Sequence, residues 1–322
     1  MKRIGKHEGI GNVVVEDAPV PEIGPREILV RNVRTLISRG SEIGRRYLHP
    51  GEIDPAIMGY SAAGYVAAVG TDVTEYLIGQ RVAIMAPHAE YVVGDVDRDD
   101  GSWITPIPDS VTFDAATFHP LVIGALTWAK ISAVQPHETV VILGQGLVGA
   151  LVLQAVRAYK PERLIAVDAL DRRRALATQF GADVVIDAAT EDPVARVKEL
   201  TGGAGAHVVI DCVGGKAGVV SFAQGLDMCR PLGRIHLIAL YHGEPLPLDA
   251  GKIQSRLLIG GYYTEESRKP FADWAMAAID SGEIQVDPMI THHFSFTQAK
   301  EAFDILYHRP GEAFGVLLDW PD

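Results

Sequence analysis

The chain has 322 residues, of which 48% are hydrophobic and 22% charged, so it can bury a large core and is long enough for two domains. Its net charge of −12, from 29 basic and 41 acidic residues, argues against general binding to nucleic acids or anionic membranes, which requires clustered lysine and arginine. The N-terminus lacks the apolar segment of a secretory signal, and two cysteines are too few for a disulfide framework. We therefore expect a cytoplasmic protein.

The first 120 residues contain short β segments separated by glycine and proline. These segments are Ile28–Arg34, Gly64–Val69, Arg81–Met85 and Glu90–Val93. Their length and spacing predict a β-rich, barrel-like module with few long helices.

From Thr139 onward, strand patterns alternate with helix patterns. The predicted strands are Thr139–Leu143, Arg163–Asp168, Asp183–Asp187, His207–Asp211, Gly233–Leu240 and Leu257–Gly261. Helices are predicted at Gly149–Tyr159, Arg172–Phe180 and Pro193–Leu200, and near Ala217–Arg230. This alternation is typical of a doubly wound α/β domain with a parallel sheet, which binds its ligand at the carboxyl ends of the strands.

The C-terminal tail has two helical stretches, Pro270–Ser281 and Thr297–Tyr307, followed by a strand at Gly315–Leu318. Because the alternating segment is internal, we expect the tail to fold back onto the N-terminal module. The predicted domains are residues 1–121 with 266–322, and residues 122–265.

Gly144, Gly146 and Gly149 form a G-x-G-x-x-G motif directly after the first alternating strand. In a dinucleotide-binding turn, the first glycine permits the tight turn and the second lets the backbone approach a pyrophosphate. The third lets the helix pack on the strand. A membrane span over Val140–Val156 is excluded, because a span needs about 20 residues and this run divides into strand, turn and helix.

Asp168 ends the second alternating strand, where an acid that binds the ribose 2′-hydroxyl is expected. A carboxylate there repels a 2′-phosphate, so the pattern favours NAD over NADP. Arg172, Arg173 and Arg174 follow, and we expect at least one guanidinium near the adenosine end of the coenzyme. The alternative is a tight turn in another α/β protein, with Asp168 capping a helix.

Several further short segments match one protein family, and they occur in the same order along the chain as in that family. They are Pro25–Val30, Met58–Val66, Gly79–Val82, His88–Val93, Ile107–Val111, Phe180–Asp183 and Ile290–Phe294. Over nearly its whole length the sequence resembles the medium-chain dehydrogenase/reductase superfamily. The resemblance implies a Rossmann doubly wound parallel sheet together with a β-rich GroES-like catalytic domain.

The chain departs from the zinc-dependent members of that family at the metal ligands. Arg39 stands in place of the first ligand, a cysteine, and Tyr60 in place of the second, a histidine. Ser61 replaces the accompanying glutamate, and the lobe with four structural-zinc cysteines is absent between Val93 and Ile107. We therefore expect no zinc at either site. The segment 37–42 is most similar to the zinc-less branch that includes bacteriochlorophyllide dehydrogenases.

Without a metal, other groups must manage the proton of the reacting hydroxyl. The resemblance places His119 near the coenzyme cleft, where an imidazole can serve as general acid or base. Tyr60 and Ser41 are the next candidates, and Ser41 matches the family's relay hydroxyl. Arg39 binds an anionic substrate group or pairs with Glu42, for which a structural ion pair with an arginine is expected. As alternatives, His119 is a helix-start residue and Tyr60 fills the space of the missing metal.

The motif and the resemblance together give a set of expected coenzyme contacts. They are Gly144, Gly146, Leu147, Val148, Gly149, Asp168, Arg173, Val213, Ile238, Ala239, Leu240, Gly261 and Tyr262. Backbone groups of residues 238–240 and 261–262 would meet the nicotinamide carboxamide.

The function expected from the sequence is zinc-independent, NAD-dependent interconversion of a secondary alcohol and a ketone in an interdomain cleft. The substrate would be a hydroxylated small molecule, such as a sugar, a cyclitol or a natural-product intermediate. Two rivals stay open: reduction of an enone or quinone C=C bond, and NAD binding without catalysis. The apolar sixth strand, Leu257–Gly261, predicts a homodimer or homotetramer, because an uncovered sheet edge invites pairing with a second copy.

Overall fold

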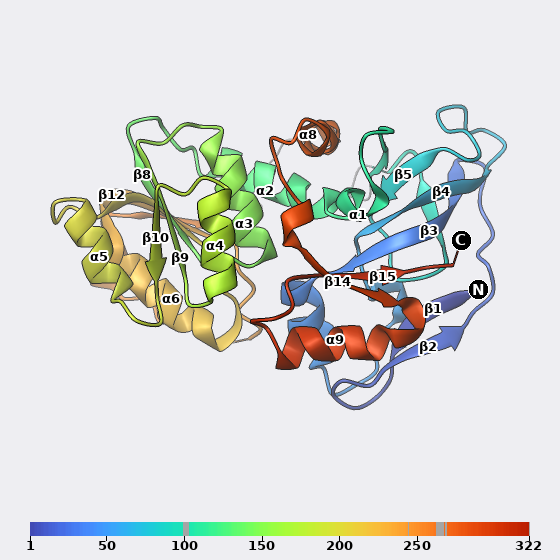
Figure 1. The fold of residues 1–322 in the computed structure, drawn as a ribbon, viewed down its shortest axis with the longest axis horizontal. Helices are drawn as coiled ribbons and strands as arrows, with labels where there is room; N and C mark the ends of the chain where they lie inside the picture. Colours follow the sequence, from blue (N-terminus) through green and yellow to red (C-terminus); the bar gives the residue numbers. More distant parts are fainter. Residues whose placement is uncertain (99–102, 244, 262–266, 268, 322) are drawn as a thin grey trace. The chain divides into compact units, whose positions relative to one another are not determined.

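The computed structural model describes residues 1–98, 103–243, 245–261, 267 and 269–321. The chain forms two compact units (Figure 1). We call residues 1–123 with 267–322 the split unit, and residues 124–266 the internal unit. The boundaries expected from the sequence lie within two residues of these. Among the described residues, no helix has the length and hydropathy needed to cross a membrane.

The split unit contains a small sheet and a large one. In the small sheet, β1 (Lys2–Lys6) pairs antiparallel with β2 (Val13–Asp17). The large sheet has the order β14-β15-β3-β4-β5-β7, and β6 also pairs with β3. Its strands are β3 (Glu27–Ile37), β4 (Ala62–Val69), β5 (Arg81–Ile84), β6 (Tyr91–Asp95), β7 (Ile104–Pro106), β14 (Ile290–Ser295) and β15 (Gly315–Asp319).

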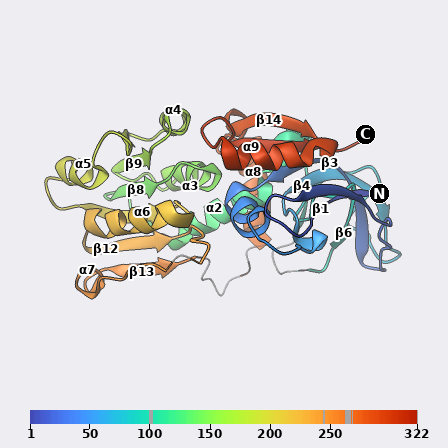
Figure 2. The same ribbon diagram turned by 90° about the horizontal axis from the view of Figure 1, so that it is seen from below.

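The C-terminal tail completes this sheet, because β15 runs antiparallel to β3 with Leu317 opposite Leu36. Figure 1 shows the two strands side by side. The tail thus folds back onto the N-terminal module, as the sequence predicts. Helix α9 (Ala299–His308) lies beside β14 (Figure 2) and buries Phe303 and Leu306 in the core of this unit.

The remaining helices of the split unit are short, apart from α8 and the start of α2. They are η2 (Pro55–Ile57), α1 (Phe113–Ala116), α2 (His119–Ile131, which continues into the internal unit), α8 (Lys269–Asp280), η3 (Asp287–Met289) and η4 (Phe296–Gln298). The sequence did not predict η1 (Arg39–Tyr47), a π-helix that contains Arg39 and Ser41. Its wide turns show in the bond from Leu48 N to Ile43 O, which spans five residues.

The internal unit is a six-stranded parallel sheet of order β10-β9-β8-β11-β12-β13. Its strands are β8 (Thr139–Leu143), β9 (Arg163–Asp168), β10 (Val184–Asp187), β11 (Ala206–Asp211), β12 (Cys229–Leu237) and β13 (Leu257–Gly260). All five residues of β8 are buried, as expected for a central parallel strand covered on both faces. The doubly wound sheet predicted from the sequence is therefore confirmed.

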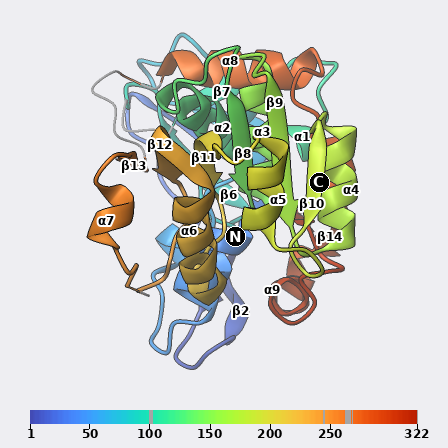
Figure 3. The ribbon, with the colours of Figure 1, turned by 90° about the vertical axis from the view of Figure 1, so that its left-hand side faces the viewer.

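The connecting helices are α3 (Leu147–Arg157), α4 (Asp171–Gln179), α5 (Pro193–Leu200), α6 (Gly215–Met228) and α7 (Ala250–Ile253). Figure 3 shows α4 next to the β10 edge and α7 next to the β13 edge. The chain reverses its direction of travel across the sheet between β8 and β11, and doubly wound folds bind ligands at such a switch point. Several element ends differ from the prediction: β12 begins at Cys229 and ends at Leu237, and α3 begins at Leu147. Residues 238–240 therefore follow the strand instead of ending it.

Candidate coenzyme and substrate sites

The glycine turn after β8, which contains Gly144, Gly146 and Gly149 and which we call the glycine cradle, has space that side chains would fill. Gly144 has a φ of +79°, and a Cβ atom there would lie 2.6 Å from Val213 Cγ2. A Cβ at Gly149 would lie 1.8 Å from the carbonyl oxygen of Gly144. Around Gly146, by contrast, a Cβ would meet no atom within 4 Å. Gly146 is the N-cap of α3, and Leu147 and Val148 begin that helix, so the open space at Gly146 adjoins a helix N-terminus, the kind of place that suits a pyrophosphate.

Asp168 lies next to this turn and is itself buried. One carboxylate oxygen accepts a hydrogen bond from Gln145 N at 2.7 Å, and the other accepts one from Leu170 N at 2.9 Å. Arg173 Nη1 lies 3.7 Å from the carboxylate. The structure thus brings Asp168 and Arg173 together beside the turn. Arg174 instead forms ion pairs with Asp171 and Asp187.

The other expected coenzyme contacts gather at the carboxyl ends of β11, β12 and β13. The amides of Ile238 and Ala239 both donate to the Asp211 carbonyl at 3.1 Å, and the Leu240 carbonyl accepts from Gly215 N at 3.0 Å. The Gly261 amide donates to Leu237 O at 2.9 Å. Tyr262 lies outside the described residues. These loops lie at the same sheet edge as the glycine turn, but the amides of Ile238, Ala239 and Gly261 already donate to carbonyls of the chain, so they are not the free donors that the sequence led us to expect.

In the split unit, Tyr60 and Ser38 form a close pair of hydroxyl groups. Tyr60 Oη donates a hydrogen bond to Ser38 Oγ at 2.6 Å. Ser38 is buried at the start of η1, whereas Tyr60 is partly exposed. Arg39 donates through Nε to Leu306 O at 3.1 Å, which anchors η1 to α9. Ser41 is half-buried on the same helix.

A buried Glu42–His88 pair holds the backbone of Ser38 and so supports this hydroxyl pair. Both side chains are fully buried, and His88 Nε2 lies 2.8 Å from Glu42 Oε2. The other Glu42 oxygen accepts a hydrogen bond from Ser38 N at 2.8 Å, which fixes the residue that carries the acceptor hydroxyl. The sequence led us to expect an arginine partner for Glu42, and Arg46 lies 3.7 Å from it, farther away than His88. Sequence reasoning missed His88, and no local signal near β6 identified it.

The groups that occupy the family's metal-ligand positions do not fit zinc. Arg39 carries a cationic guanidinium, and Tyr60 donates its hydroxyl to Ser38. The nearby Glu42 and His88, which are not at those positions, bind each other. Among the described residues, no three or more histidine, cysteine, aspartate or glutamate side chains are placed to hold a metal ion. Zinc sites in proteins use thiolate, neutral imidazole or carboxylate ligands in tetrahedral sets.

The surroundings of His119 do not support the expected role as proton carrier. His119 is 1% exposed at the start of α2, and its Nε2 donates to the Ala272 carbonyl at 2.8 Å. Burial lowers the pKa of His119 to about 4, so the ring is neutral near pH 7 and one N–H is already committed. This geometry fits the helix-start alternative better.

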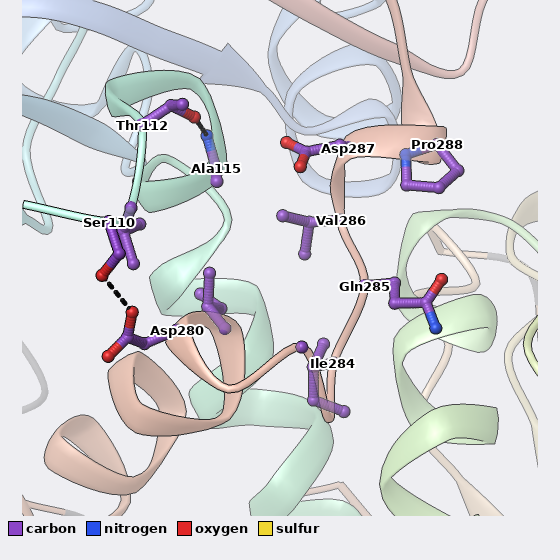
Figure 4. A pocket seen from close by; sticks show the side chains of 12 residues that line it. Ser110, Thr112, Ala115, Asp280, Ile284, Gln285, Val286, Asp287 and Pro288 are labelled. Atoms are coloured by element: carbon purple, nitrogen blue, oxygen red, sulfur yellow. Dashed lines mark hydrogen bonds between the residues drawn. The ribbon is translucent and has the colours of Figure 1, made fainter. Parts of the chain in front are cut away.

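A polar cavity of about 320 Å³ lies elsewhere in the split unit, between α1, the end of α8 and residues 282–288 (Figure 4). At its wall, Ser110 Oγ donates to Asp280, and Thr112 caps α1 by accepting from Ala115 N. None of the residues expected at the catalytic or coenzyme sites lines this cavity.

Comparison with known proteins gives two family matches. Residues 24–103 match the profile described as "Alcohol dehydrogenase GroES-like domain", and residues 148–279 match "Zinc-binding dehydrogenase". The second segment includes neither Arg39 nor Tyr60.

Curated relatives match over nearly the full length. An alcohol dehydrogenase of Cupriavidus necator is 26% identical, with 92% of each chain covered. D-Arabitol-phosphate dehydrogenase of Enterococcus avium is 28% identical, with 94% of each covered. Among solved structures, an Escherichia coli oxidoreductase of unknown specificity has a TM-score of 0.87 at 22% identity, with both chains fully covered.

Two further solved structures of this fold contain coenzymes. An alcohol dehydrogenase from E. coli CFT073 is complexed with NADH; it has a TM-score of 0.83 and 20% identity, with 99% of each chain covered. A dehydrogenase from Sinorhizobium meliloti is bound to NADP; it has a TM-score of 0.82 and 21% identity, with 99% of this chain and 98% of that one covered. The fold therefore accommodates either coenzyme.

Proposed function

Because the chain belongs to the medium-chain dehydrogenase/reductase family of oxidoreductases, we propose that it interconverts a secondary alcohol and a ketone with NAD(H) and without a catalytic metal. The observation that carries the proposal is the glycine cradle: Gly149 leaves no room for a side chain, Gly146 opens onto free space, and Asp168 lies beside both.

NAD, when bound, accepts or supplies a hydride at C4 of its nicotinamide. The chain's part is to hold it. The amides at the start of α3 would hold the pyrophosphate, and the Asp168 carboxylate would accept hydrogen bonds from the adenosine ribose hydroxyls. The negative charge of Asp168 supports NAD over NADP, because a 2′-phosphate beside a buried carboxylate is repelled. Arg173, at 3.7 Å, offsets part of that repulsion.

We assign proton handling to the Tyr60–Ser38 pair in preference to His119. Since Tyr60 donates its proton to Ser38 Oγ, the Ser38 hydroxyl has its own proton available for a substrate oxygen. In ketone reduction that proton passes to the substrate oxygen while Tyr60 resupplies Ser38; alcohol oxidation reverses both transfers. The partly exposed Tyr60 exchanges its proton with solvent.

The proposed substrate is a hydroxylated small molecule of the sugar, cyclitol or natural-product type. Ser38, Ser41 and Tyr60 offer hydroxyl groups that suit a polyol, and Arg39 offers a cation for an anionic substituent. The relative that acts on D-arabitol phosphate supports this class.

The decisive experiment measures NAD(H) turnover of the metal-stripped protein over a panel of polyols, ketones and enones. Reversible polyol oxidation supports the proposal. Irreversible enone reduction indicates a C=C reductase, binding without turnover indicates a non-catalytic role, and a stoichiometric metal required for turnover overturns the metal-free chemistry.

Variants test the assignment of the proton-handling pair. Tyr60→Phe should lower kcat roughly 10²-fold, within the range typical of general acid–base groups, and leave NADH affinity unchanged. Tyr65→Phe, on β4 with its ring against Phe113, is the matched control and should keep full activity. Equal activities of the two variants would remove Tyr60 from the mechanism.

We also propose that two copies pair through β13. This strand ends the sheet order, and Leu257 on it and Leu232 on β12 are 57% and 82% exposed. An apolar edge of this kind favours pairing across a twofold axis. Sedimentation should give a dimer or tetramer at micromolar concentration, and a monomer would contradict this. The free thiols Cys212 and Cys229 suit a reducing cytoplasm as the compartment.

A further inference from the structure

Asp211 is a fully buried carboxyl group at the end of β11 that is bonded to three other parts of the internal unit. Its Oδ1 accepts hydrogen bonds from Val213 N at 3.1 Å and from Ser221 Oγ, on α6, at 2.9 Å. Its Oδ2 accepts from Tyr241 Oη at 2.8 Å. One side chain therefore holds the loop after β11, helix α6 and the loop after β12.

The segments held by Asp211 are those expected to contact the coenzyme. The carbonyl of Asp211 accepts from the amides of Ile238 and Ala239. The side chain of Val213, whose amide Asp211 also holds, packs over Gly144 so closely that a Cβ there would lie 2.6 Å from it. The position of residues 212–214 and the shape of the glycine cradle are therefore coupled through Asp211.

We propose that Asp211 is an ionisable positioning residue whose charged form shapes the coenzyme site, so that coenzyme affinity falls when Asp211 is protonated. This inference rests on the proposed NAD(H) binding. The ionised carboxylate accepts all three hydrogen bonds at once. A neutral carboxyl group must itself donate one proton; the hydroxyls of Ser221 and Tyr241 can rotate to accept it, but the Val213 amide cannot and keeps only a weaker acceptor.

The ionisation of Asp211 falls in a measurable range. Burial raises the pKa of Asp211 to about 6. The three hydrogen bonds lower this pKa, but the effect of burial is larger. Of the neighbouring groups, Tyr241 and Cys212 both have a pKa raised by burial and stay neutral through this range. Lys216, at the start of α6, is exposed.

His242 is the neighbour that needs a control. Its ring lies 3.9 Å from a Cβ built on Gly214 and 3.8 Å from one built on Gly215. Histidine is the residue type that changes charge between pH 5 and 8, so the test includes a variant of His242.

The test is NADH affinity of the full-length protein, followed by coenzyme fluorescence from pH 5 to 8. We expect Kd to rise about fivefold below pH 6, as a charge-assisted hydrogen bond becomes a neutral one. Asp211→Asn mimics the protonated acid and should bind weakly at every pH, whereas His242→Asn should keep the wild-type profile. Tyr241→Phe removes a bond that lowers the Asp211 pKa, so its midpoint should move to higher pH.

Calorimetry gives a second readout that a purely structural role would not produce. At pH 6, NADH binding to the wild type should release a fraction of a proton, seen as different heats in buffers of different ionisation enthalpy. Asp211→Asn should abolish this release while its melting temperature confirms that it is folded.

Two outcomes overturn the inference: a pH profile of Asp211→Asn identical to the wild type, or loss of the profile in His242→Asn. Failure of the proposed function is distinguishable, because it would show as no NADH or NADPH binding at any pH.

Discussion

One of the two candidate sites is formed by backbone and the other by side chains. In the internal unit, the glycine cradle consists of backbone, and two of its three glycines are required because a side chain would overlap neighbouring atoms. In the split unit, the Tyr60–Ser38 pair and its Glu42–His88 support consist of side chains from three separate places in the chain, because Ser38 and Glu42 both lie at the start of η1. A backbone site tolerates little change, whereas a side-chain site can exchange its chemistry while the fold persists.

The largest effect should come from the backbone site. In Gly149→Ala the new Cβ would lie 1.8 Å from Gly144 O, an overlap that only backbone movement can relieve. We expect the internal unit to lose about 4 kcal/mol of unfolding free energy, at the upper end for single substitutions, together with NADH binding. Urea denaturation and coenzyme fluorescence measure both.

Gly146→Ala is the matched control, because its Cβ would meet no atom of the chain and its φ is −67°. It should unfold like the wild type yet bind NADH weakly, since the methyl group would occupy the space proposed for the pyrophosphate. Normal NADH binding by Gly146→Ala would show that the coenzyme does not lie there.

The side-chain site should respond differently to single and paired substitutions. His88→Phe leaves Glu42 buried without its close partner and should cost about 3 kcal/mol of unfolding free energy. Removing both polar groups, in Glu42→Met with His88→Phe, should restore part of this stability, because no buried charge is then left. Turnover should stay low in both variants. In the double variant Ser38 N has lost Glu42 as its acceptor, and in the single variant Glu42 is displaced from Ser38 N.

A double-mutant cycle on unfolding free energies checks this, with Tyr65→Phe as a substitution distant from the pair. Additive effects would mean that Glu42 and His88 do not stabilise each other.

The same contrast explains what could be predicted from the sequence. The parallel sheet and the glycine turn follow from local rules, namely buried β-branched strands and glycines at fixed spacing. The sequence could therefore predict that Gly144 follows β8 and that Asp168 ends β9. The partner of Glu42 could not be found this way. His88 lies 46 residues away, and the family-like segment His88–Val93 says nothing about what the imidazole contacts. The π-helix that carries Arg39 and Ser41 was missed for a similar reason: contacts with α9, rather than an apolar repeat, stabilise it.

Substitution of His119 tests whether Tyr60, and not His119, handles the substrate proton in the split unit. His119→Gln should change kcat less than about threefold, because the ring is buried and neutral, whereas a catalytic base would lose about 10²-fold or more. The folded-state pKa of about 4 lies below the unfolded value of 6.5, so the unfolded chain takes up the proton first as pH falls. Stability is therefore fully present above pH 6.5 and declines toward pH 4.

The decline expected from His119 alone is about 3 kcal/mol between pH 6.5 and 4, from a pKa difference of about 2.5 units. The glutamine variant should lack this part of the acid destabilisation in urea titrations. An acid limb unchanged by the substitution would show that the imidazole is accessible to protons in the folded protein.

The smallest effect should be on coenzyme choice. Asp168→Asn keeps an acceptor for Gln145 N but removes the charge, leaving Arg173 beside the ribose site without its carboxylate. The ratio of NADPH to NADH dissociation constants should fall about tenfold, equivalent to about 1.4 kcal/mol. Asp183→Asn is the control, because Asp183 likewise accepts from a backbone amide, Leu164 N, but at the opposite end of β9. If both variants shift the ratio equally, net charge and not the position of Asp168 sets the preference. A shift confined to Asp168→Asn would mean that one carboxylate adjusts a site otherwise made of backbone.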